Sequence, residues 1–368
     1  MAKPATAEKI RGNELGCISA YDQFLKEENI PVVGGFFIQD VRKVELAPWK
    51  RMGAMGAYLN LEGSEGVNDS YLLEIPAGKS TKPQKHMFEE LVFVVSGRGA
   101  TTVWTDGGKK QTFEWQEGSL FSPPLNAWYQ HFNGQGDQPV RVLGMTDAPT
   151  VMNLFHNQDF IFNCDFVFKD RYTGEDDFFS GQGKFLAERF WESNFIQDVR
   201  AFQLKDQSAR GAGGTGIMLE IANNVMSAHI SEFPVGTYKK AHRHGAGAHV
   251  IVLKGEGYSM MWPEGSNFKR YDWHEMSLFV PPEMWFHQHF NKGAESARYL
   301  ALKPFTSRKY PGLKKQFGTS EDVKEGGSQI EYEDESPEIR KIFEAELAKI
   351  GAPSHMDEVL KGIRKKSA

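Results

Sequence analysis

The chain contains two copies of one sequence pattern. The hexapeptide Phe-Ile-Gln-Asp-Val-Arg begins at Phe37 and returns unchanged at Phe195, an offset of 158 residues. The same offset relates glycines, tryptophans and longer runs over about a hundred residues without a gap. It relates Gly97 to Gly255, Trp115 to Trp273, and 130–133 to 288–291. A match of this length in one register predicts an internal duplication, with two copies of one folded module.

Each copy has the pattern of an all-β module. In the first copy, short segments rich in β-branched and aromatic residues, such as ELVFVVSG and KQTFEW, alternate with Gly, Asp or Pro turns. Short strands at regular spacing are typical of a barrel or jelly roll and not of a parallel sheet. The 37 glycines and the 12% aromatic content suit a turn-rich β protein with a large core. We therefore predict an all-β fold made of a duplicated jelly-roll barrel, with short terminal helices.

The duplication divides the chain into five parts. They are an N-terminal arm with a short amphipathic helix at 17–29 (1–36), a first barrel (37–145), a linker (146–194), a second barrel (195–304), and a C-terminal tail with short helices near 337–350 and 356–366 (305–368). The linker is rich in phenylalanine, so we expect it to pack on the barrels. Polar tails of this kind cover a sheet edge or a neighbouring subunit, and we expect a homo-oligomer.

The composition excludes several classes of protein. The chain has 368 residues, of which 40% are hydrophobic and 25% charged, as in soluble globular proteins. A net charge of −5 does not indicate a nucleic-acid surface or a cationic membrane patch. No apolar run is long enough for a membrane helix or a signal peptide, and two cysteines are too few for a disulfide framework. We expect a cytoplasmic protein with no nucleic-acid or membrane partner.

Three histidines of the second copy form a candidate metal site. His242 and His244 are two residues apart on a segment that we expect to be extended, so their side chains lie on one face. His287, on a later strand, would complete a facial set for a divalent transition metal. The alternative is that the three imidazoles satisfy backbone groups at a barrel rim.

The first copy has other residues at the equivalent positions. Gln84 and Tyr129 stand where the second copy has His242 and His287, and His86 corresponds to His244. Gln and Tyr are poor ligands for a divalent metal at neutral pH, although Tyr can ligate iron. We therefore predict a degenerate first site, in which Glu90 and Tyr129 hydrogen-bond each other. The alternative is that His86, Glu90 and His131 still bind an ion.

Two residues beside His287 are candidates for the substrate pocket. Strand alternation places Trp285 and His289 on the same face as His287, one on either side. We expect Trp285 to line the pocket and His289 to act as an acid or base. Because His289 belongs to a run that the first copy shares, a purely structural role is the alternative. The basic residues Lys239 and Lys240, and those at 364–366, are interpreted as ordinary solvated charges.

The order of these residues resembles the two signature motifs of the cupin superfamily. His242-x-His244 is followed, roughly forty residues later, by Pro282, His287 and Asn291. Cupins are small antiparallel β-barrels that hold a metal near one open end, and two motifs in this order imply that fold. Their common pattern has a glutamate where this chain has Ala248.

The second copy also resembles a narrower group. Its run A-H-R-H-x-x-x-A, with three histidines and no carboxylate, resembles the gentisate and salicylate 1,2-dioxygenase group of bicupins. The resemblance implies Fe(II) held by His242, His244 and His287, with a hydroxylated aromatic acid and O₂ as substrates and ring opening as the reaction. The duplicated region, 37–303, also resembles bicupins labelled ethanolamine ammonia-lyase-activating proteins.

Three classes of function remain open. The first is an oxidoreductase, an Fe(II) dioxygenase that acts on a hydroxylated aromatic acid or another anionic chelating substrate. A site without a carboxylate is positively charged and leaves up to three coordination positions open, which suits such a substrate. The second is a metal-dependent isomerase, lyase or hydrolase, and the third is a non-catalytic ligand-binding or activating protein. We expect an enzyme with Fe(II), and Mn, Ni, Cu and Zn are alternative metals.

Overall fold

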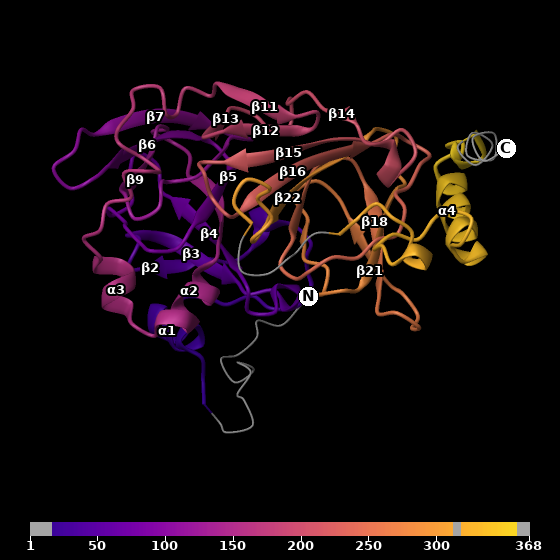
Figure 1. Ribbon diagram of the computed structural model, residues 1–368, viewed down its shortest axis with the longest axis horizontal. Helices are drawn as coiled ribbons and strands as arrows, with labels where there is room; N and C mark the ends of the chain where they lie inside the picture. The colour runs from indigo at the N-terminus through magenta and orange to yellow at the C-terminus, as the bar shows by residue number, and fades with distance from the viewer. Residues whose placement is uncertain (1–16, 312–317, 359–368) are drawn as a thin grey trace.

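The computed structural model describes residues 17–311 and 318–358, and it is built mainly of antiparallel sheet. In Figure 1 the first half of the chain, in indigo to magenta, lies on the left, and the second half, in orange, lies on the right. Each half has one large sheet and one three-stranded sheet. The prediction of a duplicated all-β fold with short helices is confirmed. None of the helices in the described residues has the length and apolar character that spanning a bilayer requires.

The first half has a seven-stranded sheet in the order β13-β8-β5-β10-β4-β3-β2. Its strands are β2 (Ala47–Trp49), β3 (Ala54–Leu59), β4 (Asp69–Ile75), β5 (Glu90–Ser96), β8 (Leu120–Phe121), β10 (Val140–Thr146) and β13 (Phe195–Ile196). The small sheet, in the order β7-β6-β9, consists of β6 (Arg98–Trp104), β7 (Gln111–Gln116) and β9 (Trp128–Asn133).

The second half has a nine-stranded sheet in which β14 pairs with β15 beside the main order β1-β20-β17-β22-β16-β15-β12-β11. Its strands are β1 (Phe37–Ile38), β11 (Gly183–Ala187), β12 (Phe190–Ser193), β14 (Lys205–Asp206), β15 (Thr215–Ile221), β16 (Ser227–Phe233), β17 (His249–Lys254), β20 (Leu278–Phe279) and β22 (Ala297–Lys303). The small sheet, in the order β19-β18-β21, consists of β18 (Gly257–Trp262), β19 (Lys269–Trp273) and β21 (Phe286–Asn291).

Short helices flank these sheets. They are α1 (Ala20–Glu28), α2 (Ala148–Phe155), α3 (Gln158–Asn163) and α4 (Pro337–Lys349), with 3₁₀ turns η2 (Val41–Lys43), η3 (Glu62–Ser64), η4 (Ser208–Arg210) and η5 (Val323–Glu325). Helix α1 begins where the Ser19 hydroxyl accepts a hydrogen bond from the Asp22 amide at 3.0 Å. The linker that we predicted at 146–194 contains α2, α3, β11 and β12. The second predicted tail helix, at 356–366, lies largely outside the described residues.

The central strands of the two large sheets are buried on both faces. Along β5, Leu91 and Phe93 contribute to a core between the halves, whereas Val92 and Val94 contribute to the core of the first half. The core between the halves also contains Ile230 of β16, together with other residues of the second half's large sheet. Burial on both sides explains why these strands are nearly continuous apolar runs.

The first strand of each copy pairs with the opposite half. β1 is antiparallel to β20, with Ile38 opposite Leu278. β13 is antiparallel to β8, with Ile196 opposite Leu120. Our sequence-based boundaries place β1 in the first barrel and β13 in the second. In the structure each strand instead extends the large sheet of the other half.

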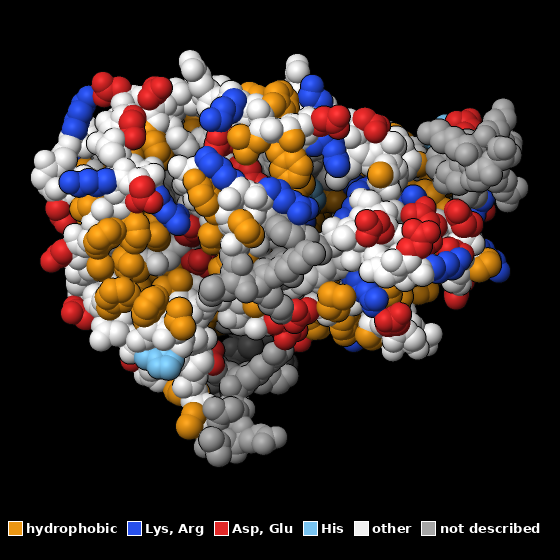
Figure 2. Space-filling view, in the orientation of Figure 1, with side chains coloured by type: hydrophobic (Ala, Val, Ile, Leu, Met, Phe, Trp, Pro, Cys, Tyr) orange, Lys and Arg blue, Asp and Glu red, His pale blue; other side chains and the backbone are white. Residues whose placement is uncertain are grey.

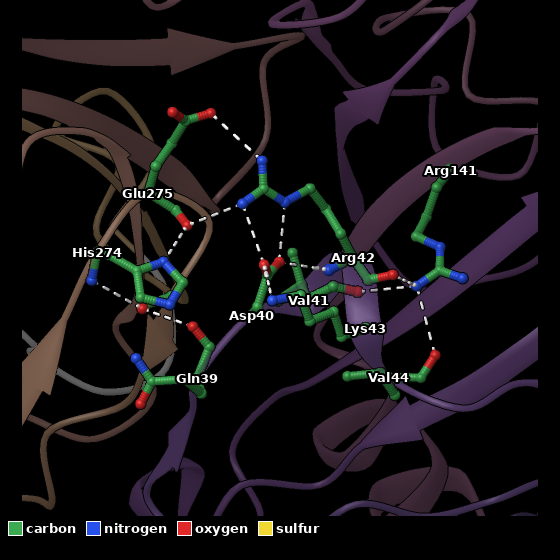
Figure 3. Close-up of polar contacts among 10 residues, drawn as sticks. Gln39, Asp40, Val41, Arg42, Lys43, Val44, Arg141, His274 and Glu275 are labelled. Carbon is green, nitrogen blue, oxygen red and sulfur yellow. Dashed lines mark hydrogen bonds and ion pairs between the residues drawn. The ribbon is translucent and has the colours of Figure 1, made fainter.

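The segment that follows β1 also makes polar contacts with both halves (Figure 3). The Arg42 guanidinium hydrogen-bonds Asp40 at 2.9 Å and forms an ion pair with Glu275 of the second half at 3.6 Å. Arg141 of β10 donates to the carbonyl oxygens of Val41, at 3.0 Å, and Val44, at 3.3 Å. The segment after β1 is therefore fixed to both halves at once.

The C-terminal tail forms an extra strand-like contact beside the candidate metal site. The Ile330 amide donates to the Ala241 carbonyl at 2.9 Å, and the Arg243 amide donates to the Ser328 carbonyl at 2.9 Å. Gln329, between them, is fully buried. The expectation that the tail covers an exposed edge is confirmed for this segment.

Candidate metal centre and its cavity

The structure brings His242, His244 and His287 together. His242 and His287 form an antiparallel bridge, and His287 lies on β21. One nitrogen of each imidazole lies within 4.8 Å of the nitrogens of the other two. The ring centroids are 4.3 Å apart for His242 and His287, and 4.7 Å apart for His244 and His287. The predicted facial arrangement of three imidazoles is therefore present.

Each imidazole is oriented through its Nδ1 atom. Nδ1 lies 3.2 Å from the Lys240 carbonyl in His242, 2.8 Å from the Gly245 carbonyl in His244 and 3.1 Å from the Trp285 carbonyl in His287. A carbonyl oxygen only accepts, so each Nδ1 carries the proton and each Nε2 keeps its lone pair. Backbone contacts of this kind are the usual outer shell of metal-binding histidines.

Burial keeps the three imidazoles neutral. It lowers the pKa of His242 and His244 well below the ordinary value, and the neighbouring His287 lowers both further. Burial likewise lowers the pKa of His287 to about 3. Neutral imidazoles with a free Nε2 lone pair are the form that binds a transition metal, so the donor set fits a divalent ion.

The cluster contains no carboxylate among the described residues. Ala248, at the position where the cupin pattern has a glutamate, is buried and offers no ligand atom. Three neutral donors leave the full charge of a divalent ion uncompensated by the protein. The site therefore favours anionic ligands.

A cavity of about 290 Å³ lies beside the cluster, bordered by His242 and His244. Side chains of β16 and β22, including His229, Tyr299 and Lys303, also line it. The described lining is Arg189, Phe190, Gln207, Arg210, Met218, His229, Ser231, Lys239, His242, His244, Tyr299, Lys303, Thr306, Arg308, Gly318, Thr319 and Ser320. Its volume is near the lower end of the range for small-molecule sites.

All the charged residues in this lining are cations. They are Arg189, Arg210, Lys239, Lys303 and Arg308, and the described lining contains neither Asp nor Glu. In the space-filling view, blue Lys and Arg side chains gather in the middle of the molecule over β15, β16 and β22 (Figure 2). The cavity therefore attracts anions.

One of these cations corrects a sequence-based interpretation. We interpreted Lys239 and Lys240 as solvated charges, but Lys239 is only 2% exposed and lines the cavity. Its Nζ donates to the Ser231 hydroxyl at 2.5 Å. Lys240 is paired with Glu331 of the tail, and its side chain is 12% exposed. The basic residues at 364–366 lie outside the described part of the chain.

His289 belongs to a hydrogen-bond network beneath the cluster. The Trp273 indole donates to the Ser259 hydroxyl at 3.0 Å, and that hydroxyl lies 2.8 Å from His289 Nδ1. The first half contains the equivalent chain, in which Trp115 donates to Thr101 at 2.8 Å and Thr101 lies 2.7 Å from His131 Nδ1. The repetition agrees with a structural role, while the ring of His289 lies 5.6 Å from that of His287.

Trp285 lies elsewhere in the second half. It is absent from the described lining of the cavity, and its ring packs 6.1 Å from that of Phe36. Its carbonyl nevertheless orients His287. The assignment of Trp285 to the substrate pocket stays a prediction.

The equivalent positions of the first half are occupied by an internal hydrogen-bond network. The Gln84 amide donates to the carbonyls of Arg51, at 3.1 Å, and Lys82, at 3.2 Å. His86 Nε2 lies 3.1 Å from the Tyr129 hydroxyl and 3.4 Å from a Glu90 carboxylate oxygen.

Among the described residues, this half contains no group of three closely spaced metal-ligating side chains. Burial raises the pKa of Tyr129, and so do the charge of Glu90 and a hydrogen bond to it. Glu90 also accepts a hydrogen bond from Tyr71. Burial lowers the pKa of His131 to about 4, and its Nε2 has no partner among the described residues. Glu90 Oε2 likewise has no hydrogen-bond partner among the described residues, and the degenerate first site stays a prediction.

The sequence patterns did not point to Arg210, His229 or Lys303 as site residues. Strand alternation could have placed some of these residues together. Tyr299 and Lys303 share one face of β22, and His229 shares a face of β16 with Ser231. Arg210 follows no such pattern, because the 3₁₀ turn η4 and the tail bring it to the cavity.

No family model matches the chain, and no curated protein matches it. Its fold is similar to that of Lactobacillus farciminis oxalate decarboxylase in a formate complex, with 12% identity and a TM-score of 0.50 over 76% of this chain and 87% of that one. It is also similar to a structure of Bacillus subtilis oxalate decarboxylase that was used to study the Mn(II) centres of that enzyme. The identity is 12% and the TM-score is 0.50, over 77% of this chain and 79% of that one. The predicted bicupin fold is therefore confirmed, with open sheets in place of closed barrels. The resemblance to the ring-cleaving dioxygenases stays a prediction.

Proposed function

We propose that this protein is a metal-dependent enzyme that holds a divalent transition metal on His242, His244 and His287 and acts on an anionic, chelating substrate. One observation carries the proposal. Three neutral imidazoles, each with Nδ1 held by a backbone carbonyl, form one cluster, and two of them, His242 and His244, border a cavity whose described charged lining is entirely cationic.

The residues of the chain have distinct parts in this proposal. The three Nε2 atoms hold the ion, and the carbonyls of Lys240, Gly245 and Trp285 fix the ring orientations. The cationic walls attract the substrate and neutralise its charge. The tail covers the segment that carries His242 and restricts water at that edge.

The first candidate reaction is dioxygenation of a hydroxylated aromatic acid, with Fe(II) as the metal. Iron bound there would supply O₂ activation and Lewis-acid polarisation of the substrate. A protein that donates only three ligands leaves room for a bidentate substrate and O₂. A carboxylate beside a hydroxyl provides a bidentate anion of this kind.

The second candidate is cleavage of a small anionic substrate without net O₂ consumption, with Mn as the metal. Its support is the fold, which the chain shares with oxalate decarboxylases that contain Mn(II) centres. The cationic cavity suits both candidates, because both substrates are carboxylates.

Oxygen uptake separates the two candidates. The full chain, purified without chelators and then loaded with Fe(II) or Mn(II), is incubated with salicylate, gentisate and oxalate in an oxygen electrode. We expect substrate-dependent O₂ uptake with Fe(II) and a hydroxylated aromatic acid, and none in His287→Ala. Product without O₂ uptake would favour the second candidate. Metal binding without any product would favour a non-catalytic binding protein.

A further inference from the structure

We infer that the ligand of this cavity carries two anionic groups, and that Arg210, Lys239 and Lys303 form a subsite for the group that does not face the histidine cluster. The inference rests on the proposed function for the role of the first group and adds the class of substrate. The subsite itself is defined by contacts that are independent of a metal.

The three cations lack carboxylate partners in the described part of the chain. Arg210 donates to two neutral oxygens, the Gly318 carbonyl at 3.0 Å and the Gln329 side chain at 3.4 Å. Lys239 donates to the Ser231 hydroxyl, and its Nζ lies 5.4 Å from the centre of the Tyr299 ring. For Lys303, none of the described carboxylates lies within ion-pair distance.

Neighbouring cations of the same half differ in this respect. Arg243 is paired with Glu264 at 2.7 Å, and Arg298 with Glu232 at 2.6 Å. Lys240, adjacent to Lys239, is paired with Glu331. The lack of a carboxylate partner among the described residues thus distinguishes Arg210, Lys239 and Lys303 from these neighbouring cations.

Holding three such cations together is costly without a counter-charge. Burial, followed by repulsion from Arg210, lowers the pKa of both Lys239 and Lys303 to about 7. Burial also lowers the pKa of Arg210 to about 10. A buried charge stabilises a protein only when a partner satisfies it, and an anionic ligand would supply that partner here.

The position of the subsite explains why two anionic groups are needed. The subsite and the histidine cluster border one cavity of about 290 Å³, so a short molecule can reach both. A single carboxylate directed at the histidines would leave the subsite unsatisfied. His229 also lines the cavity, and its buried Nδ1 has no partner among the described residues, so it can bind a polar group between the two charges. A second carboxylate and a phosphate share the required chemistry.

The test compares dianions with matched monoanions. Malonate and succinate are titrated by calorimetry against acetate and propionate, with inorganic phosphate as a separate arm, on the full chain. We expect a dicarboxylate to bind about 10- to 100-fold more tightly than the monoanions, as a charge-assisted contact allows, whereas phosphate, a single anionic group, tests the subsite alone. Preference for phosphate or for the dicarboxylates identifies which second anion the subsite accepts.

Variants assign this preference to the subsite. Lys303→Met and Arg210→Gln should each reduce dianion affinity about tenfold and leave metal content unchanged. Lys254→Met is the matched control, because Lys254 is 49% exposed and paired with Glu295 at 3.1 Å. If Lys303→Met does not fold, the dianion affinity of Arg210→Gln alone shows whether the preference depends on the subsite.

A metal-free background separates this inference from the proposed function. In His287→Ala, phosphate or dicarboxylate should still bind, and Arg210→Gln should weaken that binding. Dianion binding that depends on Arg210 in a protein that never loads metal would support the subsite and overturn the proposed function. Metal loading without any preference for dianions, or a preference that survives both subsite variants, would overturn this inference and leave the proposed function standing.

Discussion

The backbones of His242 and His287 exchange two hydrogen bonds, of 3.0 and 2.9 Å. Gln84 and Tyr129 exchange the same two bonds in the first half, at 2.8 and 2.9 Å. The duplicated halves therefore share the backbone pairing of these two positions and differ in the side chains that the positions carry. Whether a half binds metal should depend on those side chains alone.

Restoring the histidines should accordingly create a second metal site. The double variant Gln84→His, Tyr129→His adds two imidazoles to the existing His86 and Glu90, which complete a ligand set of the common cupin type. We predict that bound metal rises from about one to about two equivalents per chain, measured by elemental analysis. Tyr129→Phe is the control and should bind no additional metal. An unchanged metal content in the double variant would show that the first half lacks more than its ligands.

Substitution of His289 should show whether this residue acts as an acid or base or only supports the fold. We predict that His289→Ala keeps its metal and loses about 10²- to 10⁴-fold in turnover, the range for a lost acid or base. His131→Ala is the matched control, because His131 makes the same contact to Thr101 that His289 makes to Ser259. Both variants should lose similar stability in chemical denaturation. Full activity in His289→Ala would assign the residue to the fold.

The halves should not fold independently. A fragment spanning 194–368 lacks β1, so β20 loses the partner strand that pairs Ile38 with Leu278. It also exposes the apolar face that packs on the first half, including Ile230 and Leu300. We predict that the fragment aggregates or is partly unfolded in circular dichroism. A soluble fragment with one cooperative melting transition would contradict this prediction.

Binding of a dicarboxylate should weaken as the pH rises above 7. Lys239 and Lys303 bind anions in their protonated forms, and their pKa values in the free protein are about 7. Succinate remains doubly ionised above about pH 6.5, so a change in affinity reports on the protein. Calorimetry should give the highest affinity near pH 6.5 and a progressive loss towards pH 9. A constant affinity would show that these lysines do not contact the ligand.

The same lysines predict how stability depends on pH without a ligand. Their pKa values of about 7 in the folded protein are lower than that of an unfolded lysine, about 10.4. The unfolded state therefore binds more protons between these values, and this contribution to the free energy of unfolding rises with pH. Lys303→Met should reduce the slope between pH 7 and 9 in denaturant titrations. An unaltered slope would indicate that Lys303 is charged throughout.

The duplication made much of the fold and the histidine cluster predictable. Two copies in one register identify equivalent positions, so His242 and His287 can be compared directly with Gln84 and Tyr129. Strand alternation then places the ligands on one face. Both inferences use patterns that can be read directly from the sequence, namely the register of the repeat and the alternation of side chains along a strand.

The exchange of β1 and β13 could not be predicted in this way. The two hexapeptides are identical, so nothing in them specifies which half each strand joins. The cationic cavity was also missed, because Lys239 and Lys240 are adjacent in sequence but differ in burial and partners. Arg210 reaches the cavity through the tail contact at Gly318, which has no local sequence signal.

Metal analysis of the full chain, purified without chelators, tests the central claim most directly. We predict about one equivalent of a divalent transition metal per chain, lost in His242→Ala and in His287→Ala and retained in His86→Ala. Two equivalents in the unmodified chain, or metal retained when both His242 and His287 are replaced, would contradict a single three-histidine centre in the second half.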